Sequence, residues 1–224
     1  MILVVSAHRP ELTGLRAILG DDLRGTSGGR SVVARAVGIG LSAAAIGTVS
    51  ALAEFEPRAV VFVGTCGAYA GRGPSIGEAV VGRKVHLVSV AEVEGRADFP
   101  EPMRTELDLD GMLADALTSA GARQVTVATT LAITTDDLLA EQIAARRGCD
   151  VEHLEAFAAA EACAARGIPF GVVLGVANLV GSTARREWLA HHRAAGDAAG
   201  ALVARWLEHG ARGLEVPDGG PAKT

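Results

Sequence analysis

Short apolar runs recur along the chain, and between them apolar residues return every three or four positions. The runs lie at residues 2–6, 31–37, 59–63, 79–81 with 85–90, 124–131 and 171–177. Unbroken apolar runs of this length are typical of strands that are buried on both faces of a sheet. We therefore expect a sheet whose two faces are both covered.

The spacing between the runs is that of amphipathic helices. It predicts helices at residues 10–19, 42–55, 109–120, 137–147, 155–165 and 182–209. Residues 21–29 and the glycine-rich residues 64–69 are predicted to form turns, and residues 91–103 a loop. In the last helix Ser182 is the expected N-cap, and the expected inward face is Trp188, Leu189, Ala198, Leu202, Val203 and Trp206.

Strands and helices alternate in this order, which favours an α/β fold with a central mixed, mostly parallel sheet. Helices on both faces of that sheet make a three-layer α/β/α sandwich. Because no linker or internal repeat interrupts the pattern, residues 1–210 are expected to form a single domain. Residues 211–224 lack hydrophobic periodicity and are expected to be a disordered tail.

Composition narrows the class of protein. Of 224 residues, 49% are hydrophobic but only 4% are aromatic, so Ala, Val and Leu must build the core. The net charge of -5 and the lack of a basic cluster argue against a nucleic-acid partner. No apolar run approaches the roughly 20 residues of a membrane-spanning helix, and the start of the chain does not resemble a signal peptide. Three cysteines without paired spacing fit a reducing compartment, so a cytoplasmic protein is expected.

Motifs for common cofactors and catalytic metals are missing from the sequence. Gly38 and Gly40 lack the third glycine of a dinucleotide-binding fingerprint, and no P-loop lysine is found. There is no HExxH motif, no cysteine–histidine cluster and no GxSxG elbow. We therefore expect neither a cofactor nor a metal ion. Cys66 lies in the glycine-rich turn, where a packing role is better supported than a nucleophilic one.

Three polar residues lie at strand ends or in the helical turn that follows, namely Glu11, Glu155 and Asn178. In open α/β sheets, ligands bind at the carboxyl ends of the strands. Spacing alone explains Glu11 as a first-turn acid and Asn178 as a turn residue. Glu155 is harder to explain, because mostly Ala, Phe and Cys follow it. A buried carboxylate without donors costs several kcal/mol, so ligand hydroxyls are the expected donors.

Four stretches resemble motifs of the nucleoside phosphorylase and nucleosidase superfamily, which includes purine phosphorylases, methylthioadenosine/S-adenosylhomocysteine nucleosidases and futalosine hydrolases. SAHRPE at residues 6–11 resembles the first-strand motif, in which a Glu follows an Ala by four residues. GIG at 38–40, followed by Ala43 and Ala44, resembles the family's G-x-G turn. VGTCGA at 63–68 with IGEAVV at 76–81 resembles its glycine-rich signature, and EHLE at 152–155 resembles E-x-M-E. The resemblance covers about residues 1–210 and implies an α/β/α sandwich.

This resemblance implies a role for each candidate residue. Glu11 would orient or activate water, and Glu155 would bind the ribose hydroxyls beside Glu152 and Leu154. Leu154 replaces the methionine that packs on the sugar in the family. Asn178 takes the position of an Asp that protonates the purine N7 in adenine-specific nucleosidases. Because an amide cannot donate a catalytic proton but can pair with a 6-oxopurine, the expected substrate is a 6-oxopurine nucleoside.

Further contacts to the substrate are expected under this hypothesis. Phe99, from the loop over the site, would stack on the base. Contacts beside the base or the nucleophile would come from Thr65, Cys66 and Gly67. The residues that look most like the futalosine hydrolase branch are Arg185, Arg186 and Trp188. In this family a neighbouring subunit often completes the 5′ pocket, which implies a homo-oligomer, either a dimer or a hexamer.

The sequence leaves the nucleophile open between water and phosphate. The phosphorylases of the family usually carry an Arg two residues before the first glycine of the signature, and here that residue is Phe62. This favours water, because an anionic nucleophile needs paired charge, although Arg9 could contact phosphate or the 5′ group. The main hypothesis is hydrolysis of the N-ribosidic bond of a 6-oxopurine nucleoside. The alternatives are phosphorolysis of such a nucleoside and a non-catalytic nucleoside-binding or sensory protein.

Overall fold

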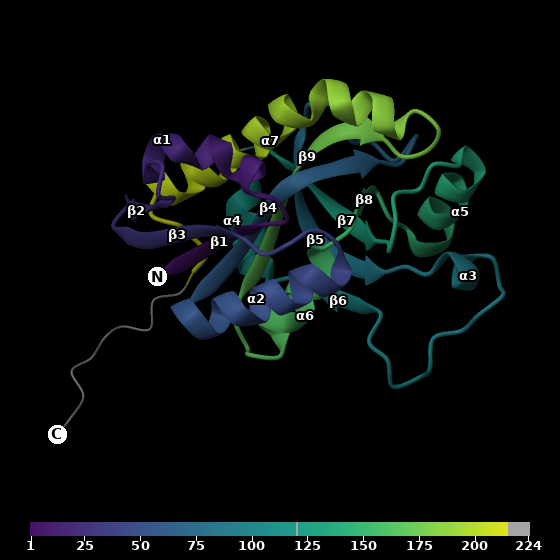
Figure 1. Cartoon of the computed structure of the whole chain (residues 1–224), viewed down its shortest axis with the longest axis horizontal. Coiled ribbons are helices and arrows are strands. Elements are labelled where there is room, and N and C mark those ends of the chain that lie inside the picture. The colour runs from purple at the N-terminus through teal and green to yellow at the C-terminus, as the bar shows by residue number, and fades with distance from the viewer. Residues whose placement is uncertain (120, 215–224) are drawn as a thin grey trace.

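The computed structural model describes residues 1–119 and 121–214. Nine strands in these residues form one mixed sheet, ordered β2-β3-β1-β4-β8-β7-β5-β6, with β9 paired to both β4 and β5 (Figure 1). The strands are β1 (Ile2–Ser6), β2 (Arg24–Ser27), β3 (Arg30–Ala36), β4 (Ala59–Ala68), β5 (Ala79–Leu87), β6 (Glu106–Asp108), β7 (Arg123–Thr129), β8 (Val151–His153) and β9 (Phe170–Leu179).

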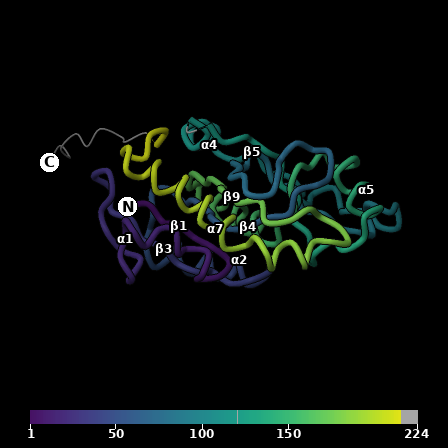
Figure 2. Tube along the Cα trace, turned by 90° about the horizontal axis from the view of Figure 1, so that it is seen from above, coloured from purple at the N-terminus to yellow at the C-terminus, as the bar shows by residue number. Residues whose placement is uncertain are grey.

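Helices cover both faces of this sheet. They are the 3-10 helix η1 (Arg9–Leu15) and the α-helices α1 (Arg16–Leu19), α2 (Leu41–Phe55), α3 (Val90–Val93), α4 (Gly111–Thr118), α5 (Asp137–Arg147), α6 (Ala156–Ala164) and α7 (Ala184–Glu208). The core on one face joins the strands to α2 and α6, and the core on the other joins them to η1, α1, α4 and α7. Seen from above, α7 crosses β4 and β9 (Figure 2). The predicted three-layer sandwich is confirmed.

The strand pairings enclose the second half of β4. β1, β3, β4 and β9 are parallel to one another, and so are β5, β7 and β8. The two groups meet through antiparallel pairs, β4 with β8 and β5 with β9. The pairings β4–β9–β5–β7–β8–β4 therefore close a circuit. Residues 64–68 of β4 lie along β9 in this circuit, and residues 67 and 68 also pair with β8.

Several predicted turns and loops contain regular structure. β2 lies within residues 21–29, β4 continues to Ala68 through the glycine-rich residues, and α3 begins the loop at 91–103. β6 and β8 were not predicted, because three residues are too few to show an apolar pattern. The glycine-rich half of β4 keeps strand geometry because β9 pairs along its whole length. The first predicted helix is a 3-10 helix that continues as the four-residue α1.

The start of α7 differs from the sequence prediction. Thr183 is the N-cap of α7, whereas the Ser182 hydroxyl donates to Asp137. Trp188 and Leu189 are 41% and 60% exposed, so their predicted inward orientation is wrong. The first turns of α7 lie over the ends of β4 and β9 rather than over the core. The buried residues of its second half are Ala195, Gly196, Ala199, Gly200, Leu202, Val203, Trp206 and Leu207.

The residues after α7 begin close to the core. Ala211 is buried there, and the indole Nε1 of Trp206 donates to the carbonyl of Arg212 at 2.9 Å. The rest of the predicted tail, residues 215–224, lies outside the described residues, as does Ala120 at the predicted end of α4. Within the described part of the chain, no helix has the length and apolar character needed to cross a membrane.

Candidate functional site

Three segments bring the predicted site residues to the second half of β4. Glu11 lies on η1, which follows β1, and hydrogen-bonds to Thr65. Glu155 lies where β8 leads into α6, and β8 pairs with the end of β4. Asn178 lies within β9, not beyond its end as predicted, and pairs in register with Gly67. The structure thus gathers Glu11, Glu155 and Asn178 along residues 64–67.

Glu11 is held at both carboxylate oxygens. Oε2 accepts a hydrogen bond from the His8 backbone N–H at 3.2 Å, and Oε1 accepts from the Thr65 N–H and hydroxyl at 3.1 and 3.2 Å. The pKa of Glu11 is raised from 4.5 to about 7, chiefly by burial. The hydrogen bonds lower this pKa and the charge of Glu155 raises it. Near neutral pH this carboxyl can therefore both accept and release a proton.

Thr65 connects Glu11 to α7. Its hydroxyl donates to Glu11 and accepts a hydrogen bond from the indole Nε1 of Trp188 at 3.3 Å. The Trp188 ring stacks on His192, with ring centroids 4.3 Å apart and an interplanar angle of 16°. Trp188, which the hydrophobic pattern assigned to the core, therefore borders the site. Its place in a motif similar to the futalosine hydrolases was the signal that pointed to it.

Glu155 is the N-cap residue of α6 and is only 4% exposed. Its Oε1 accepts a hydrogen bond from the Gly40 backbone N–H at 2.7 Å. Its Oε2 lies 3.3 Å from Nε2 of His153. Oε1 thus has one backbone donor and Oε2 lies beside the His153 ring, and each oxygen has a further lone pair for a ligand hydroxyl.

Gly64 separates the two carboxylates. A methyl group at this position would lie 3.3 Å from Oε1 of Glu11 and 3.4 Å from Nε2 of His153. Glu11 and the His153–Glu155 pair therefore approach the same stretch of backbone. Glycine here keeps the space between them free of side chain.

Glu152 points away from His153, because successive side chains on a strand face opposite sides. Its carboxylate accepts hydrogen bonds from the Thr134 N–H at 2.9 Å, the Thr134 hydroxyl at 2.6 Å and the Tyr69 hydroxyl at 3.1 Å. Burial raises the pKa of Glu152. Glu152 thus fixes the segment between β7 and α5, whose Thr134 carbonyl accepts from Gly181 just after β9. The resemblance had suggested a direct contact with the sugar.

Asn178 is packed against the backbone of β4. The register between β4 and β9 shifts between Cys66 and Gly67, and a methyl group at Gly67 would lie 2.7 Å from Nδ2 of Asn178. Nδ2 donates to the carbonyl of Leu179 at 2.8 Å. Among the described residues, no donor is hydrogen-bonded to the side-chain carbonyl oxygen Oδ1 of Asn178. That oxygen is a ready acceptor for an N–H group of a ligand.

The other predicted contacts are more scattered. Cys66 is 3% exposed in the core, and burial raises the pKa of its thiol, which keeps the thiol protonated. Phe99 is partly buried against the core that contains α2 and α6. Leu154 is partly exposed next to Glu155. The exposed Arg9 donates from Nη2 to the Asp21 carbonyl at 3.3 Å, which directs its guanidinium toward the loop after α1.

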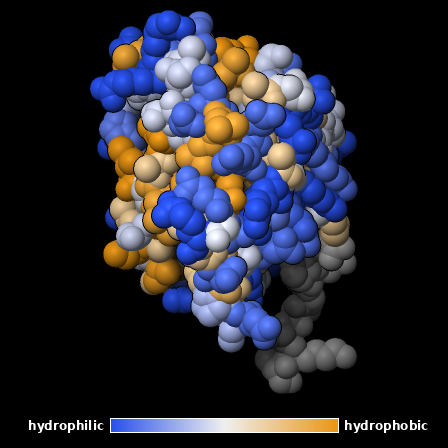
Figure 3. Space-filling view, turned by 90° about the vertical axis from the view of Figure 1, so that its right-hand side faces the viewer, coloured by the Kyte–Doolittle hydropathy of each residue, from blue (hydrophilic) through white to orange (hydrophobic). Residues whose placement is uncertain are grey.

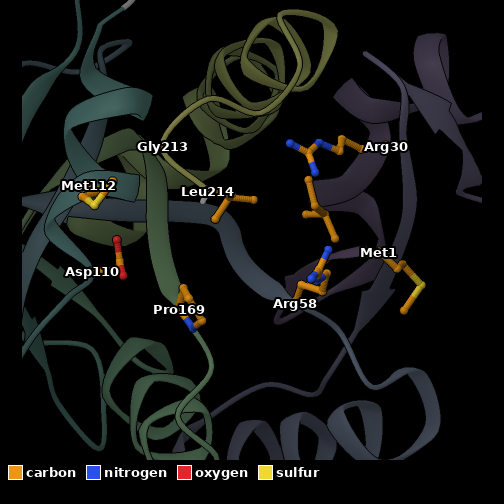
Figure 4. Close-up of a pocket in the computed structure, with 9 residues that line it drawn as sticks. Met1, Arg30, Arg58, Asp110, Met112, Pro169, Gly213 and Leu214 are labelled. Carbon is orange, nitrogen blue, oxygen red and sulfur yellow. The ribbon is translucent and has the colours of Figure 1, made fainter. Parts of the chain in front are cut away.

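A hollow of about 220 Å³ lies at the opposite end of the sheet, between the starts of β1, β3, β4 and β9 (Figure 4). The side chains of Arg30 and Arg58 point into it. None of the candidate residues lines it, and ligands in α/β sheets bind at the carboxyl ends of strands. We therefore keep the candidate site at residues 64–67. In residues 1–119 and 121–214, no three His, Cys, Asp or Glu side chains converge to hold a metal ion.

Apolar side chains are exposed around the site end of the molecule. Figure 3 shows orange patches among hydrophilic residues on the side that carries α3 and α5. The exposed apolar residues near the ends of β3, β7 and β9 and on the helices that follow are Ile39, Ile46, Val49, Leu131, Ile133, Leu138, Leu179, Trp188 and Leu189. These residues form a candidate interaction surface.

A family model, described as the Phosphorylase superfamily, matches residues 16–208. The match spans most of the chain, and the protein belongs to this superfamily. A comparison with curated proteins finds no match.

Solved structures share the fold over nearly the whole chain. The 5′-methylthioadenosine/S-adenosylhomocysteine nucleosidase from Colwellia psychrerythraea 34H, in complex with adenine, is 20% identical, covers 93% of this chain and 94% of its own, and has a TM-score of 0.82. The corresponding nucleosidase from Neisseria meningitidis is 22% identical, with coverages of 92% and 98% and a TM-score of 0.80. Futalosine hydrolase from Helicobacter pylori is 14% identical, with coverages of 90% and 94% and a TM-score of 0.81.

Proposed function

We propose that this protein is a nucleosidase that hydrolyses the N-ribosidic bond of a 6-oxopurine nucleoside. The observation that carries the proposal is the pair of carboxylates, Glu11 and Glu155, on the two sides of Gly64. Glu11 has a pKa near neutrality, whereas Glu155 accepts a hydrogen bond from the Gly40 N–H and lies 3.3 Å from Nε2 of His153. Pairs of acids in such different environments are typical of sites that divide proton transfer from charge stabilisation.

The chemistry assigned to the two acids follows from the bond to be broken. Departure of the purine leaves positive charge on the sugar, and Glu155 binds the 2′ and 3′ hydroxyls by charge-assisted hydrogen bonds. Glu11 accepts a proton from the attacking water, for which a pKa near the working pH is well suited. The purine leaves with the electron pair of the broken C1′–N9 bond and takes up a proton from solvent. Thr65 keeps the Glu11 carboxylate in place from the backbone and from its hydroxyl.

Asn178 supports the choice of base. Its amide cannot protonate a leaving adenine, which removes the function of an Asp at this position. Its carbonyl can accept the N1–H or N7–H of a 6-oxopurine while the Nδ2 group faces O6. Gly67 fixes the amide beside β4, where the base would lie.

Water is favoured over phosphate by the charges around the site. Phe62 is fully buried in β4 and meets His153 edge to face, with centroids 5.0 Å apart and an interplanar angle of 81°. It therefore puts an apolar ring where the related phosphorylases carry an arginine. Arg9 is directed toward Asp21. An anionic nucleophile next to two carboxylates would lack the paired cation it needs.

Two relatives support a nucleoside substrate, since one structure holds adenine and the other is a futalosine hydrolase. We extend the proposal to the compartment and the assembly. The three buried free thiols fit a reducing cytoplasm. The exposed apolar surface at the site end fits a homo-oligomer rather than a nucleic-acid partner.

The test is product release from purified protein in phosphate-free buffer. Inosine and futalosine should yield hypoxanthine and a free sugar, and they should be better substrates than methylthioadenosine or adenosine. Turnover that requires added phosphate and yields ribose 1-phosphate would establish a phosphorylase instead. Tight purine binding in calorimetry without turnover of any nucleoside would favour a binding or sensory protein.

A further inference from the structure

His153 lies between a helix terminus and the sugar-binding acid. It is the last residue of β8, and its side chain is 5% exposed. Its Nδ1 is within hydrogen-bonding distance of the backbone N–H groups of Glu155 at 3.2 Å and Ala156 at 3.1 Å. These two amides belong to the beginning of α6 and have no partner within the helix.

The two amides determine where the imidazole carries its proton. A ring nitrogen that accepts hydrogen bonds from N–H groups bears no hydrogen itself, so the proton of the neutral ring lies on Nε2. Nε2 lies 3.3 Å from Oε2 of Glu155, so its proton is next to this carboxylate oxygen. The histidine therefore joins two amides of α6 to the Glu155 carboxylate in one defined orientation.

The surroundings keep this imidazole neutral. Burial lowers the pKa of His153, and the charge of Glu155 raises it only in part. Phe62 packs edge to face against the ring, and Gly64 leaves room for Nε2. The carboxyl of Glu11 also faces Gly64. Protonation at Nδ1 would in addition turn an acceptor for two amides into a donor that opposes them.

We propose that His153 is a positioning residue for Glu155, acting as a neutral hydrogen-bond donor. Together with the Gly40 N–H, it fixes one lone pair on each carboxylate oxygen and leaves the others to meet the two vicinal hydroxyls of the sugar. This inference deepens the proposed function and rests on it, since it assigns Glu155 to the ribose.

Two substitutions separate the two roles of the His153 ring, which are acceptance of hydrogen bonds at Nδ1 and donation from Nε2. In His153→Asn, the side-chain oxygen can replace Nδ1 and keep the amides of α6 paired, but nothing reaches Glu155. In His153→Gln, the longer amide can replace Nε2 and donate to Glu155. With inosine, we expect kcat/KM to fall about tenfold to hundredfold in the Asn variant, as for the loss of one hydrogen bond to a charged group, while the Gln variant keeps more activity.

The readout must distinguish positioning from loss of structure. With 2′,3′-dideoxyinosine, which has no hydroxyls for Glu155 to bind, His153→Asn and the wild type should differ less than threefold. Equal fractional losses on inosine and on the dideoxy substrate would overturn the positioning role. His209→Asn, at the far end of α7, is the matched control and should leave both substrates unaffected.

A second measurement does not depend on turnover. The ring ¹⁵N chemical shifts of His153 should report a proton on Nε2 and none on Nδ1 from about pH 6 to pH 8, without titration across this interval. A charged ring or the opposite tautomer would overturn the proposal. If the wild type turned over no nucleoside, the proposed function would fail. The ¹⁵N chemical shifts would still show whether His153 is neutral with its proton on Nε2.

Discussion

Glu11 and Glu155 are placed in different surroundings by the same short piece of β4. Glu11 is buried near a second carboxylate, and its pKa rises to about 7. Glu155 accepts a hydrogen bond from the Gly40 backbone N–H and lies 3.3 Å from Nε2 of the buried His153. In the proposed mechanism the two acids therefore have different roles, because Glu11 exchanges a proton with water and Glu155 binds the sugar hydroxyls.

The pH dependence of turnover tests the role of Glu11. As a base, Glu11 acts when ionised, so kcat/KM should fall about tenfold per pH unit below a pKa near 7 and level off above it. Glu11→Gln should remove this acid limb and lower kcat/KM by ~10²–10⁴-fold. The measurement is initial rate against pH for both proteins. An acid limb that persists in the Gln variant would assign the ionisation to another group.

The stability of the fold tests the same pKa independently. Because the pKa of Glu11 is raised, the folded protein binds this proton more tightly than the unfolded chain does. The free energy of unfolding should therefore fall as pH rises from about 4.5 to about 7, by at most about 3 kcal/mol. Urea titrations at pH 5 and pH 8 should show this fall in the wild type and a smaller one in Glu11→Gln. Equal pH dependence in both proteins would contradict the shift.

Asn178 determines base preference in the proposed site. Asn178→Asp restores a group that can protonate a purine, so adenosine and methylthioadenosine should gain at least tenfold in kcat/KM relative to inosine. Asn178→Ala is the control, because it removes the amide without adding an acid. It should lower kcat/KM for adenine nucleosides and for 6-oxopurine nucleosides alike. Competition assays with paired substrates directly measure the ratio of kcat/KM for an adenine nucleoside to kcat/KM for inosine. A ratio unchanged by the Asp variant would show that base choice lies elsewhere.

At the scale of elements, the sequence predicts those helices and strands that have a long hydrophobic pattern. The helices at α2, α5 and α6 and the strands at β1, β3 and β7 agree closely with their predicted ranges. β8 was missed, and with it the contact between His153 and Glu155, because a three-residue strand is defined by its partners β4 and β7. Gly40 reaches Glu155 across 115 residues, a contact that no local spacing reveals. Glu11, Glu155 and Asn178 were singled out by their positions at the predicted strand ends, and the family motifs supplied their expected roles.

The site requires small residues in the glycine-rich half of β4. In Gly67→Ala the new methyl would lie 2.7 Å from Nδ2 of Asn178 and 2.9 Å from Cγ2 of Val180. We expect a loss of about 1–3 kcal/mol in unfolding free energy and at least a tenfold loss in kcat/KM for inosine. Gly25→Ala in β2, with contacts no closer than 3.5 Å, is the matched control. Wild-type activity in Gly67→Ala would show that Asn178 does not need this position.

At the scale of the whole molecule, the two ends of the sheet differ in character. The end that holds Glu11, Glu155 and Asn178 is bordered by exposed apolar residues of the segments after β3, β7 and β9. The opposite end carries the hollow with Arg30 and Arg58. An apolar surface next to a site for a small molecule is well placed to be covered by a second copy, which would shield the substrate from water.

The assembly state tests this assignment of the surface. Light scattering should give at least twice the 22.8 kDa mass of one chain. Ile46 is 69% exposed on α2, so Ile46→Glu should place a charge in the interface, shift the protein toward the monomer and lower kcat/KM together with the mass. Met112 is 54% exposed on α4, beside the opposite hollow, and Met112→Glu should change neither. A wild-type monomer with full activity would mean that the site is complete within one chain and that the apolar surface serves another partner.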